Sequence, residues 1–241
     1  MFRILSFGKT DRGLRRSNNE DVFFVKPESG FFLVADGMGG AAAGELASRI
    51  FSETTMEVFS TADLSQSDPV KRVHQSFVSA NARILKHTDE IPEHKGMGCT
   101  AELMAFSGDK FILGHMGDSR TYRFKNGQLK QLSKDHSLVQ EQVDKGLITP
   151  EEARKHPMKN VISRAVGVDE TPALDLVRGN LSPGDLFLLC SDGLTDMVED
   201  ADILAVLAST ALLAQKAEKL VALARAGGGR DNITVVLIEI V

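Results

Sequence analysis

The stretch Thr121-Tyr-Arg-Phe-Lys-Asn-Gly-Gln-Leu-Lys-Gln-Leu132 consists of two strand-like runs on either side of the dipeptide Asn126-Gly127. Asn and Gly both tolerate positive φ, which a type I′ turn requires at its two central positions. The stretch therefore predicts an antiparallel β-hairpin. Neighbouring apolar runs are joined by equally short polar turns at residues 28–30 and 107–109, so the surrounding strands are also expected to be antiparallel.

Strand-like and helical segments alternate in blocks along the chain. Further strands are predicted at residues 4–8, 22–26, 31–35, 100–107, 110–116, 185–190 and 233–240. Helical patterns occupy residues 42–59, 69–88, 200–207 and 212–226. Because the helices come in adjacent pairs and do not follow every strand, the pattern favours antiparallel sheets covered by helices over a doubly wound parallel fold.

The composition is that of one globular domain. The chain has 241 residues, of which 42% are hydrophobic and 25% charged, which is enough to bury one sizeable core. We therefore expect a single domain spanning residues 1–241. Residues 133–167 are polar and contain two short helical stretches, at 137–145 and 150–155, so this segment is interpreted as an excursion packed on the main body.

Charge and hydropathy exclude several partners. The formal net charge is −5, and no run of Lys or Arg is longer than Arg15-Arg16, which argues against nucleic acid or an anionic membrane. No apolar run approaches the ~20 residues of a membrane span, and the first residues do not form a signal peptide. The sequence therefore predicts a cytoplasmic protein, in which Cys99 and Cys190 are reduced, buried thiols.

Aspartates recur where apolar strand-like runs meet Gly or Asn. These boundary residues are Asp36, Asp118, Asp192 and Asp231, and the acidic pair Glu20-Asp21 precedes another strand. Asp-Gly and Asp-Asn are common turn dipeptides, so any one of them alone carries little information. The recurrence predicts that the strand ends converge on one acidic site.

Converging carboxylates need cations. Each like-charge pair a few Å apart costs about 4 kcal/mol at an effective dielectric of 20. Ligand sets made only of oxygen select hard ions such as Mg²⁺, Mn²⁺ or Ca²⁺. Two such ions can activate a shared water for in-line attack at phosphorus, so the pattern predicts a hydrolase acting on a phosphoester.

A phosphate substrate also needs a cationic partner with several donors. Arg16 lies just before Glu20-Asp21, and Arg15 is the competitor for the same role. Adjacent side chains of an extended segment point to opposite sides, so only one of Glu20 and Asp21 is expected to be a direct ligand. Neither cysteine begins the Cys-x5-Arg loop of cysteine phosphatases.

Six ordered motifs carry a family resemblance. They are Arg16-Ser-Asn-Asn-Glu-Asp21, Val34-Ala-Asp-Gly-Met-Gly-Gly40, Gly96-Met-Gly-Cys-Thr-Ala101, Gly114-His-Met-Gly-Asp-Ser-Arg120, Cys190-Ser-Asp-Gly-Leu194 and Arg230-Asp-Asn-Ile-Thr234. From about Ser6 to Val241 the chain resembles the metal-dependent protein serine/threonine phosphatases of type 2C, in their short bacterial form.

The resemblance implies an α+β fold, a four-layer αββα sandwich in which helix pairs flank two central antiparallel β-sheets. Residues 133–167 would form a small flap subdomain that borders the site and influences substrate choice. The implied cofactors are two Mn²⁺ or Mg²⁺ ions, with a weaker third. The implied partners are phosphorylated proteins, the targets of a serine/threonine kinase, and the protein is expected to be a monomer.

The resemblance also implies roles in metal binding and catalysis. Asp36 would bridge the two metals, and the carbonyl of Gly37 with Glu20 or Asp21 would serve one of them. Asp192 and Asp231 would serve the other metal, so that Asp36, Asp192 and Asp231 carry the catalytic centre.

Three further roles follow by position from the same resemblance. Asp118, together with Asp192, matches the weaker third metal position. Arg16 matches the residue that grips the substrate phosphate. Asn232 is expected to fix the loop that holds Asp231.

The sequence departs from the family at the proton donor. Met38 and Ala41 stand where many relatives carry a histidine. His115, His136 or a metal-bound water could donate the proton to the leaving group. The donor therefore stays open.

Three alternative functions fit parts of the sequence. The glycines of residues 37–42 resemble a dinucleotide-binding fingerprint, but Asp36 would face the pyrophosphate and the required second strand is replaced by helix. A catalytically inactive binding module is disfavoured because Arg16 and all the candidate metal aspartates are present. Hydrolysis of small phosphoesters would need the same metal centre, and the flap favours protein substrates by analogy alone.

Overall fold

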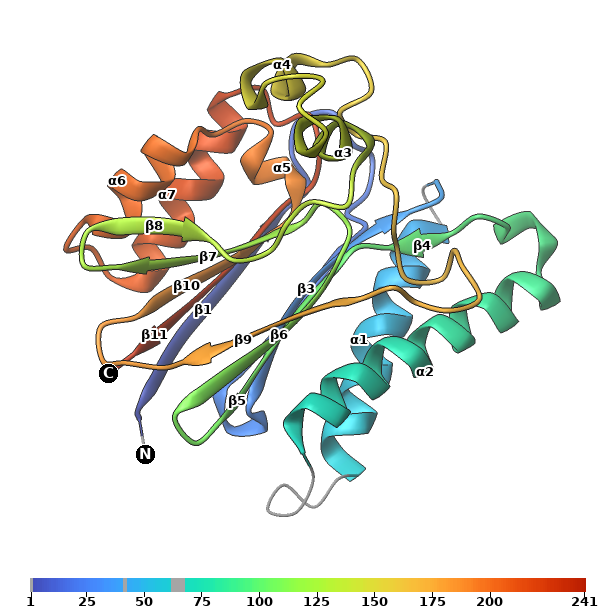
Figure 1. The fold of residues 1–241 in the computed structure, drawn as a ribbon, viewed down its shortest axis with the longest axis horizontal. Coiled ribbons are helices and arrows are strands. Elements are labelled where there is room, and N and C mark those ends of the chain that lie inside the picture. Colours follow the sequence, from blue (N-terminus) through green and yellow to red (C-terminus); the bar gives the residue numbers. More distant parts are fainter. Residues whose placement is uncertain (1, 41–42, 62–67) are drawn as a thin grey trace.

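Two antiparallel sheets form the centre of the computed structural model, which describes residues 2–40, 43–61 and 68–241 (Figure 1). The first sheet has the strand order β1-β11-β10-β7-β8, with bounds Ile4–Asp11, Ile233–Ile240, Leu186–Cys190, Arg120–Lys125 and Gln128–Gln131. The second has the order β2-β3-β5-β6-β9, with bounds Asp21–Lys26, Phe31–Met38, Ala101–Ser107, Lys110–Met116 and Asp175–Asn180. The short strand β4 (Gly98–Cys99) pairs with the end of β3.

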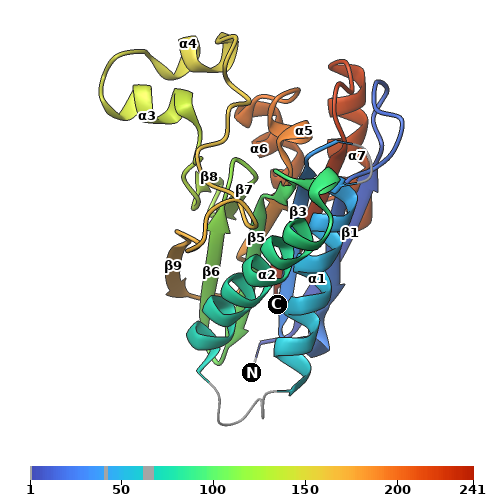
Figure 2. The same cartoon turned by 90° about the vertical axis from the view of Figure 1, so that its right-hand side faces the viewer.

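Helix pairs cover the outer faces of both sheets (Figures 1 and 2). The helices α1 (Ala43–Thr61) and α2 (Pro69–Glu90) lie on the second sheet, whereas α6 (Asp200–Ala208) and α7 (Leu213–Ala226) lie on the first. The shorter helices are α3 (Leu138–Asp144), α4 (Pro150–Lys155) and α5 (Asp192–Thr195), and single 3-10 turns occupy Pro27–Ser29 and Pro92–His94. This arrangement confirms the predicted α+β, four-layer αββα sandwich.

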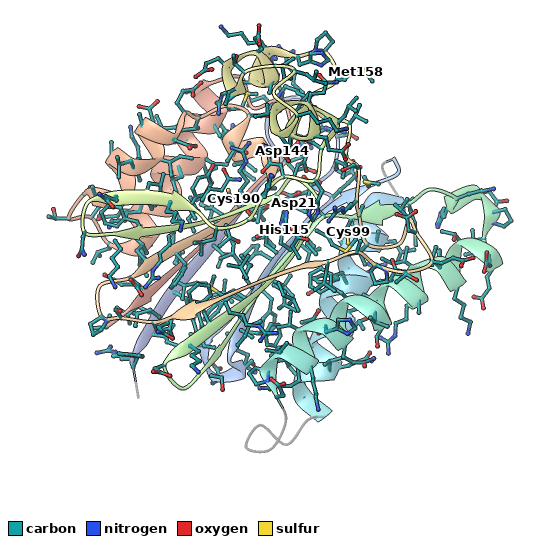
Figure 3. The ribbon with its side chains drawn as sticks, in the orientation of Figure 1. Asp21, Cys99, His115, Asp144, Met158 and Cys190 are labelled. Carbon is teal, nitrogen blue, oxygen red and sulfur yellow. The ribbon has the colours of Figure 1, made fainter. Side chains whose placement is uncertain are left out.

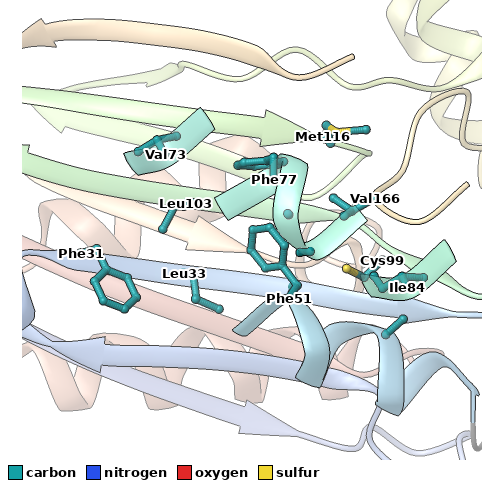
Figure 4. Close-up of a cluster of buried hydrophobic side chains, with 14 of the residues drawn as sticks. Phe31, Leu33, Phe51, Val73, Phe77, Ile84, Cys99, Leu103, Met116 and Val166 are labelled. Atoms are coloured by element: carbon teal, nitrogen blue, oxygen red, sulfur yellow. The ribbon is translucent and has the colours of Figure 1, made fainter. Parts of the chain in front are cut away.

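The central strands are buried on both faces, which explains their unbroken apolar runs. Alternate residues of a strand point to opposite sides of the sheet. In β3, Phe31 and Leu33 pack against the cluster beneath α1 and α2 (Figure 4), whereas Phe32 and Val34 pack against the other sheet. The core therefore consists of three apolar layers that hold the four structural layers together.

Local signals fix several element boundaries. In α2, the Asp68 side chain accepts a hydrogen bond from the Val70 amide at 2.9 Å, and Pro69 occupies the first turn, where its missing N–H costs nothing. At the β7–β8 turn, Asn126 and Gly127 have φ values of 50° and 75°, which confirms the predicted hairpin. The predicted helix start at Ala42 lies outside the described residues.

Besides the two-residue strand β4 and the 3-10 turns, the sequence does not predict the strand β9 or the helix α5. β9 forms the edge of the second sheet by pairing with β6, and its sequence Asp175-Leu-Val-Arg-Gly-Asn180 lacks a clear apolar alternation. The helix α5 begins at Asp192, directly after the buried strand β10, and has four residues. Both depend on tertiary contacts that the local sequence does not encode.

The flap, residues 133–167, stands over one end of the sandwich and carries α3 and α4 (Figure 1). Two ion pairs connect it to the segment around α5 and α6. Arg154 contacts Glu199 at 3.0 Å, and Lys159 pairs with Asp196.

Two sequence expectations concern the rest of the chain. Cys99 and Cys190 are free and buried, which confirms the predicted thiols. Within the described residues, none of the helices combines the length and the apolar character that crossing a membrane requires.

Candidate metal centre at the end of the sandwich

A pocket of about 260 Å³ lies beneath the flap and gathers the strand-end aspartates. Its described lining residues are Arg16, Glu20, Asp36, Gly37, Met38, Gly39, Gly40, Thr100, Asp118, Asn160, Ile162, Asp192 and Asp231. The pocket therefore brings together acidic residues that are far apart in sequence. Of the predicted site residues, Asp21 alone is missing from this lining.

Strand pairing and loop positions produce the convergence. Asp36 on β3 is paired in register with Asp21 on β2. Asp118 lies in the connection between β6 and β7, Asp192 begins α5, and Asp231 lies two residues before β11. The same end of both sheets thus carries all five carboxylates.

A close backbone contact joins two of these segments. A Cβ atom at Gly193 would lie 1.8 Å from the carbonyl oxygen of Asn232, so the residue after Asp192 has to be glycine. The contact holds the start of α5 against the Asp231-Asn232 loop and keeps the two carboxylates on one pocket.

The carboxylates raise each other's pKa values. Burial, together with the charges of Asp21 and Asp192, raises the pKa of Asp36 well above its ordinary range. Burial and the neighbouring charge of Asp118 do the same for Asp192. The pKa of Asp118 is raised to about 7 by burial and by the charges of Asp135 and Asp196. The pocket thus concentrates negative charge that the protein neutralises only in part.

These residues fit hard divalent ions. The Oδ1 atom of Asp192 is buried and accepts no hydrogen bond from the described residues. In that part of the chain, no three Asp, Glu, His or Cys side chains are already gathered closely enough to hold one ion. Mg²⁺ uses only one or two carboxylates and keeps several waters, so a shared acidic pocket of this kind suits it better than a closed protein cage would.

Glu20 and Asp21 occupy different environments. Glu20 lines the pocket, and its Oε2 atom would lie 2.0 Å from a Cβ at Gly44, so its carboxylate reaches the start of α1. The Oδ2 atom of Asp21 accepts hydrogen bonds from Ser191 at 2.8 Å and from Thr234 at 2.6 Å. Of the two, Glu20 is therefore the residue that reaches the pocket, while Asp21 (Figure 3) is held behind it by hydroxyl groups.

Arg16 lies at the edge of the pocket. Its Nη2 atom donates to Asp231 Oδ2 at 2.5 Å, and about half of its side chain is exposed. Arg15 is exposed and is not among the described lining residues. Arg16 is consequently the guanidinium that can meet a phosphate in this pocket.

The side chain of Asn232 ties the loop that holds Asp231 to the loop between β1 and β2. Its Oδ1 atom accepts from the amide of Glu20 at 2.8 Å, and its Nδ2 atom donates to the carbonyls of Arg12 and Asn18, each at 3.0 Å. The side chain therefore fixes the loop between β1 and β2, which carries Arg16. No local pattern predicts this, because every partner is more than 200 positions away in sequence.

Thr100 is a pocket residue that sequence reasoning did not single out. Its Oγ1 atom accepts from the Asp36 amide at 3.2 Å and lies 2.6 Å from the hydroxyl of Ser119. Since Ser119 follows Asp118, this hydroxyl pair connects the strand of Asp36 to the loop of Asp118. The only sequence signal was its place within the Gly96–Ala101 motif.

Neither candidate histidine lines the pocket. His115 (Figure 3) is fully buried, pairs with Glu102, and its Nε2 atom lies 2.8 Å from the carbonyl oxygen of Lys134. Burial lowers its pKa, but the Glu102 charge outweighs this and raises it to about 9. For His136, burial and the charge of His115 lower the pKa to about 4. Both therefore act as structural groups behind the site.

Known proteins resemble this chain over nearly its whole length. Residues 13–225 match the family described as Protein phosphatase 2C. The serine/threonine protein phosphatase PstP of Mycobacterium tuberculosis is 39% identical over 97% of the chain, and the chain spans 44% of that protein's length. The serine/threonine phosphatase Stp of Listeria innocua is 37% identical, with 96% of this chain and 94% of that protein covered.

A solved structure shares the fold and contains metal. The catalytic domain of PstP, described as a complex with 2 manganese ions, has a TM-score of 0.91, is 36% identical and covers 100% of both chains. The sequence and structural matches agree with each other and with the acidic pocket. The chain therefore belongs to the protein phosphatase 2C family.

Proposed function

We propose that this chain hydrolyses phosphoserine and phosphothreonine on proteins with the help of two Mn²⁺ or Mg²⁺ ions held in the acidic pocket. The observation that carries the proposal is the convergence of Asp36, Asp118, Asp192 and Asp231 on one pocket with Arg16 at its edge. Two relatives named as serine/threonine phosphatases, PstP and Stp, support the substrate class.

The family resemblance suggests a role for each pocket residue. Asp36, which feels the charges of Asp21, Asp192, Asp118 and Asp231, would contact both ions, with the Gly37 carbonyl and Glu20 on one side. Asp192 and Asp231 would hold the second ion, and Asp118 with Asp192 a weaker third. When bound, these ions supply charge neutralisation and an activated water for attack on phosphorus.

Arg16 would bind and orient the phosphate. Its planar guanidinium can donate two parallel hydrogen bonds to phosphate oxygens while Asp231 holds it in place. Asn160 and Ile162 line the pocket from the flap side.

Protonation of the leaving group is assigned to water. The described lining residues include no histidine and no lysine, and Met38 has no proton to donate. Met38 therefore cannot act as a general acid for the leaving group. The serine or threonine oxygen takes its proton from solvent at the pocket mouth.

The test compares phosphopeptides that differ only in the phosphorylated residue. With Mn²⁺, the wild-type chain should release phosphate from phosphoserine and phosphothreonine peptides faster than from the phosphotyrosine version. Asp36→Asn and Asp192→Asn should each lower the rate by about 100-fold or more, since they remove charge from the centre. Asp202→Asn, which changes an exposed aspartate in α6, serves as the control.

Two results would contradict the proposal. One is hydrolysis that persists in excess EDTA. The other is hydrolysis of small phosphoesters without any measurable action on the phosphopeptides, which would make the protein a small-molecule phosphatase.

A further inference from the structure

A second cavity, of about 390 Å³, opens beside the acidic pocket. Its lining residues include side chains of the flap helices α3 and α4 and of the segment that contains α5 and the start of α6. Both cavities share Asp118, Asn160 and Asp192 as lining residues. A phosphoprotein with its phosphate beside Arg16 could therefore place a neighbouring residue in this second cavity.

The two walls of the cavity differ in chemistry. The flap wall contributes the apolar side chains of Val139, Val143, Pro150 and Ala153. The opposite wall contributes the carboxylates of Asp196, Glu199 and Asp200. A Lys or Arg side chain has the matching form, because its aliphatic stem packs on apolar surface while its tip stays charged.

Charge pairing leaves one carboxylate of the acidic wall without a cation. Lys159 pairs with Asp196, and Arg154 contacts Glu199 at 3.0 Å. Asp200 accepts a hydrogen bond from the Tyr122 hydroxyl at 3.1 Å and has no ion pair among the described residues. The wall therefore has room for one more cation.

Lys159 and Arg154 of the flap already pair with carboxylates of the acidic wall, and both ion pairs are exposed enough for another cation to replace them. The side chains of Lys159 and Asp196 are 25% and 30% exposed, and those of Arg154 and Glu199 are 32% and 68% exposed. Ion pairs as exposed as these contribute little to stability. An incoming cation can consequently replace either flap side chain at little cost.

We propose that this cavity is a subsite for a Lys or Arg side chain close in sequence to the phosphorylated residue of the substrate. The substrate cation binds Asp200 and displaces Lys159 from Asp196, while its stem lies on Val139 and Ala153. This inference rests on the proposed function and specifies its substrates as phosphoproteins with a basic residue near the phosphorylated one.

The test uses a set of phosphothreonine peptides in an alanine and glycine background. Each peptide carries one Arg, one Glu or one additional Ala at a single position within four residues of the phosphothreonine. We expect Arg at one or two positions to raise kcat/KM about fivefold over Ala, and Glu at those positions to lower it.

Variants connect the preference to the cavity. In Asp200→Asn the ratio of kcat/KM between the Arg and Ala peptides should fall toward one, since the amide still accepts from Tyr122 but carries no charge. Asp202→Asn lies in the same first turn of α6 and does not line the cavity, so it should keep the ratio of the wild type. Lys159→Ala removes the competing flap cation and should lower KM for the Arg peptide.

Three results would overturn the proposal. They are equal rates for all peptides in the set, a preference for Glu that is lost in Lys159→Ala, and an Arg preference that survives in Asp200→Asn. In each of these cases Mn²⁺-dependent hydrolysis of the Ala peptide still supports the proposed function, so the two failures are distinguishable. Absence of hydrolysis for every peptide overturns both.

Discussion

Arg16 donates a hydrogen bond to Asp231, so the proposed phosphate clamp also neutralises one of the proposed metal ligands. The sequence indicated the guanidinium, because it precedes an acidic pair in a recognisable motif. It could not indicate the partner, which lies 215 positions away. At the residue scale, chemical identity was therefore predictable and pairing was not.

Replacing Arg16 should weaken substrate binding more than turnover. Charge-assisted hydrogen bonds contribute about 1.5–3 kcal/mol, so Arg16→Ala should raise KM for a phosphoester by roughly tenfold or more. Arg16→Lys should recover only part of this, because an ammonium group cannot make the bidentate contact. Steady-state kinetics at saturating Mn²⁺ measure both, with Arg15→Ala as the control. A loss confined to kcat would assign Arg16 another role.

The loop between β1 and β2 depends on one distant side chain. Asn232 makes three hydrogen bonds to its backbone, at Arg12, Asn18 and Glu20. The loop carries Arg16 and has no regular secondary structure of its own between Asp11 and Asp21. The hydrogen bonds from Asn232 therefore hold the conformation of this loop.

Asn232→Ala should act on catalysis through Arg16. The unfixed loop would place the guanidinium less well, so KM for a phosphoester should rise. Residues that act through one another give non-additive effects, so the double variant Asn232→Ala/Arg16→Ala should be little worse than Arg16→Ala alone. The double variant Asn232→Ala/Arg15→Ala should show the sum of the two single effects on KM. If Asn232→Ala/Arg16→Ala also shows the sum of its single effects, Asn232 does not act through that loop.

Helices and strands could be predicted where their own residues encode them, and not where a distant partner does. The β7–β8 hairpin was predicted because Asn126 and Gly127 encode their own turn, and the two predicted flap helices prove to be capped locally, by Ser137 and Thr149. The strand β9 was missed because its partner β6 defines it. The candidate pocket followed the same rule, since its acids were recognised by position whereas Thr100 was recognised only in the structure.

The whole molecule brings like charges together at one end of two stacked sheets. Raised pKa values of Asp36 and Asp192 mean that the folded protein without metal disfavours their ionised forms. The three apolar layers must therefore hold the acidic end together against this repulsion. The metal-free state carries a cost in stability that cations can remove.

Removing one carboxylate should therefore stabilise the metal-free protein and reduce the further stabilisation that metal provides. In EDTA, Asp192→Asn should melt at a higher temperature than the wild type, by about 2–4 °C for each kcal/mol of repulsion removed. Mn²⁺ at 100 times its Kd should stabilise the wild type by about 2.7 kcal/mol and the variant by less. Thermal melts with and without Mn²⁺ measure both, with Asp202→Asn as the control. A variant that melts below the wild type in EDTA contradicts this account.

The two ends of the chain are neighbours at the opposite end of the sandwich from the flap. Arg3 and Val241 exchange backbone hydrogen bonds of 3.0 and 2.8 Å next to the β1–β11 pairing. Both ends lie away from the flap in two perpendicular views (Figures 1 and 2). Because Arg3 and Val241 are adjacent, a short linker could join the two ends. New termini could then be opened at the exposed Asn126-Gly127 turn. Such a circular permutant would leave the residues of the acidic pocket in place.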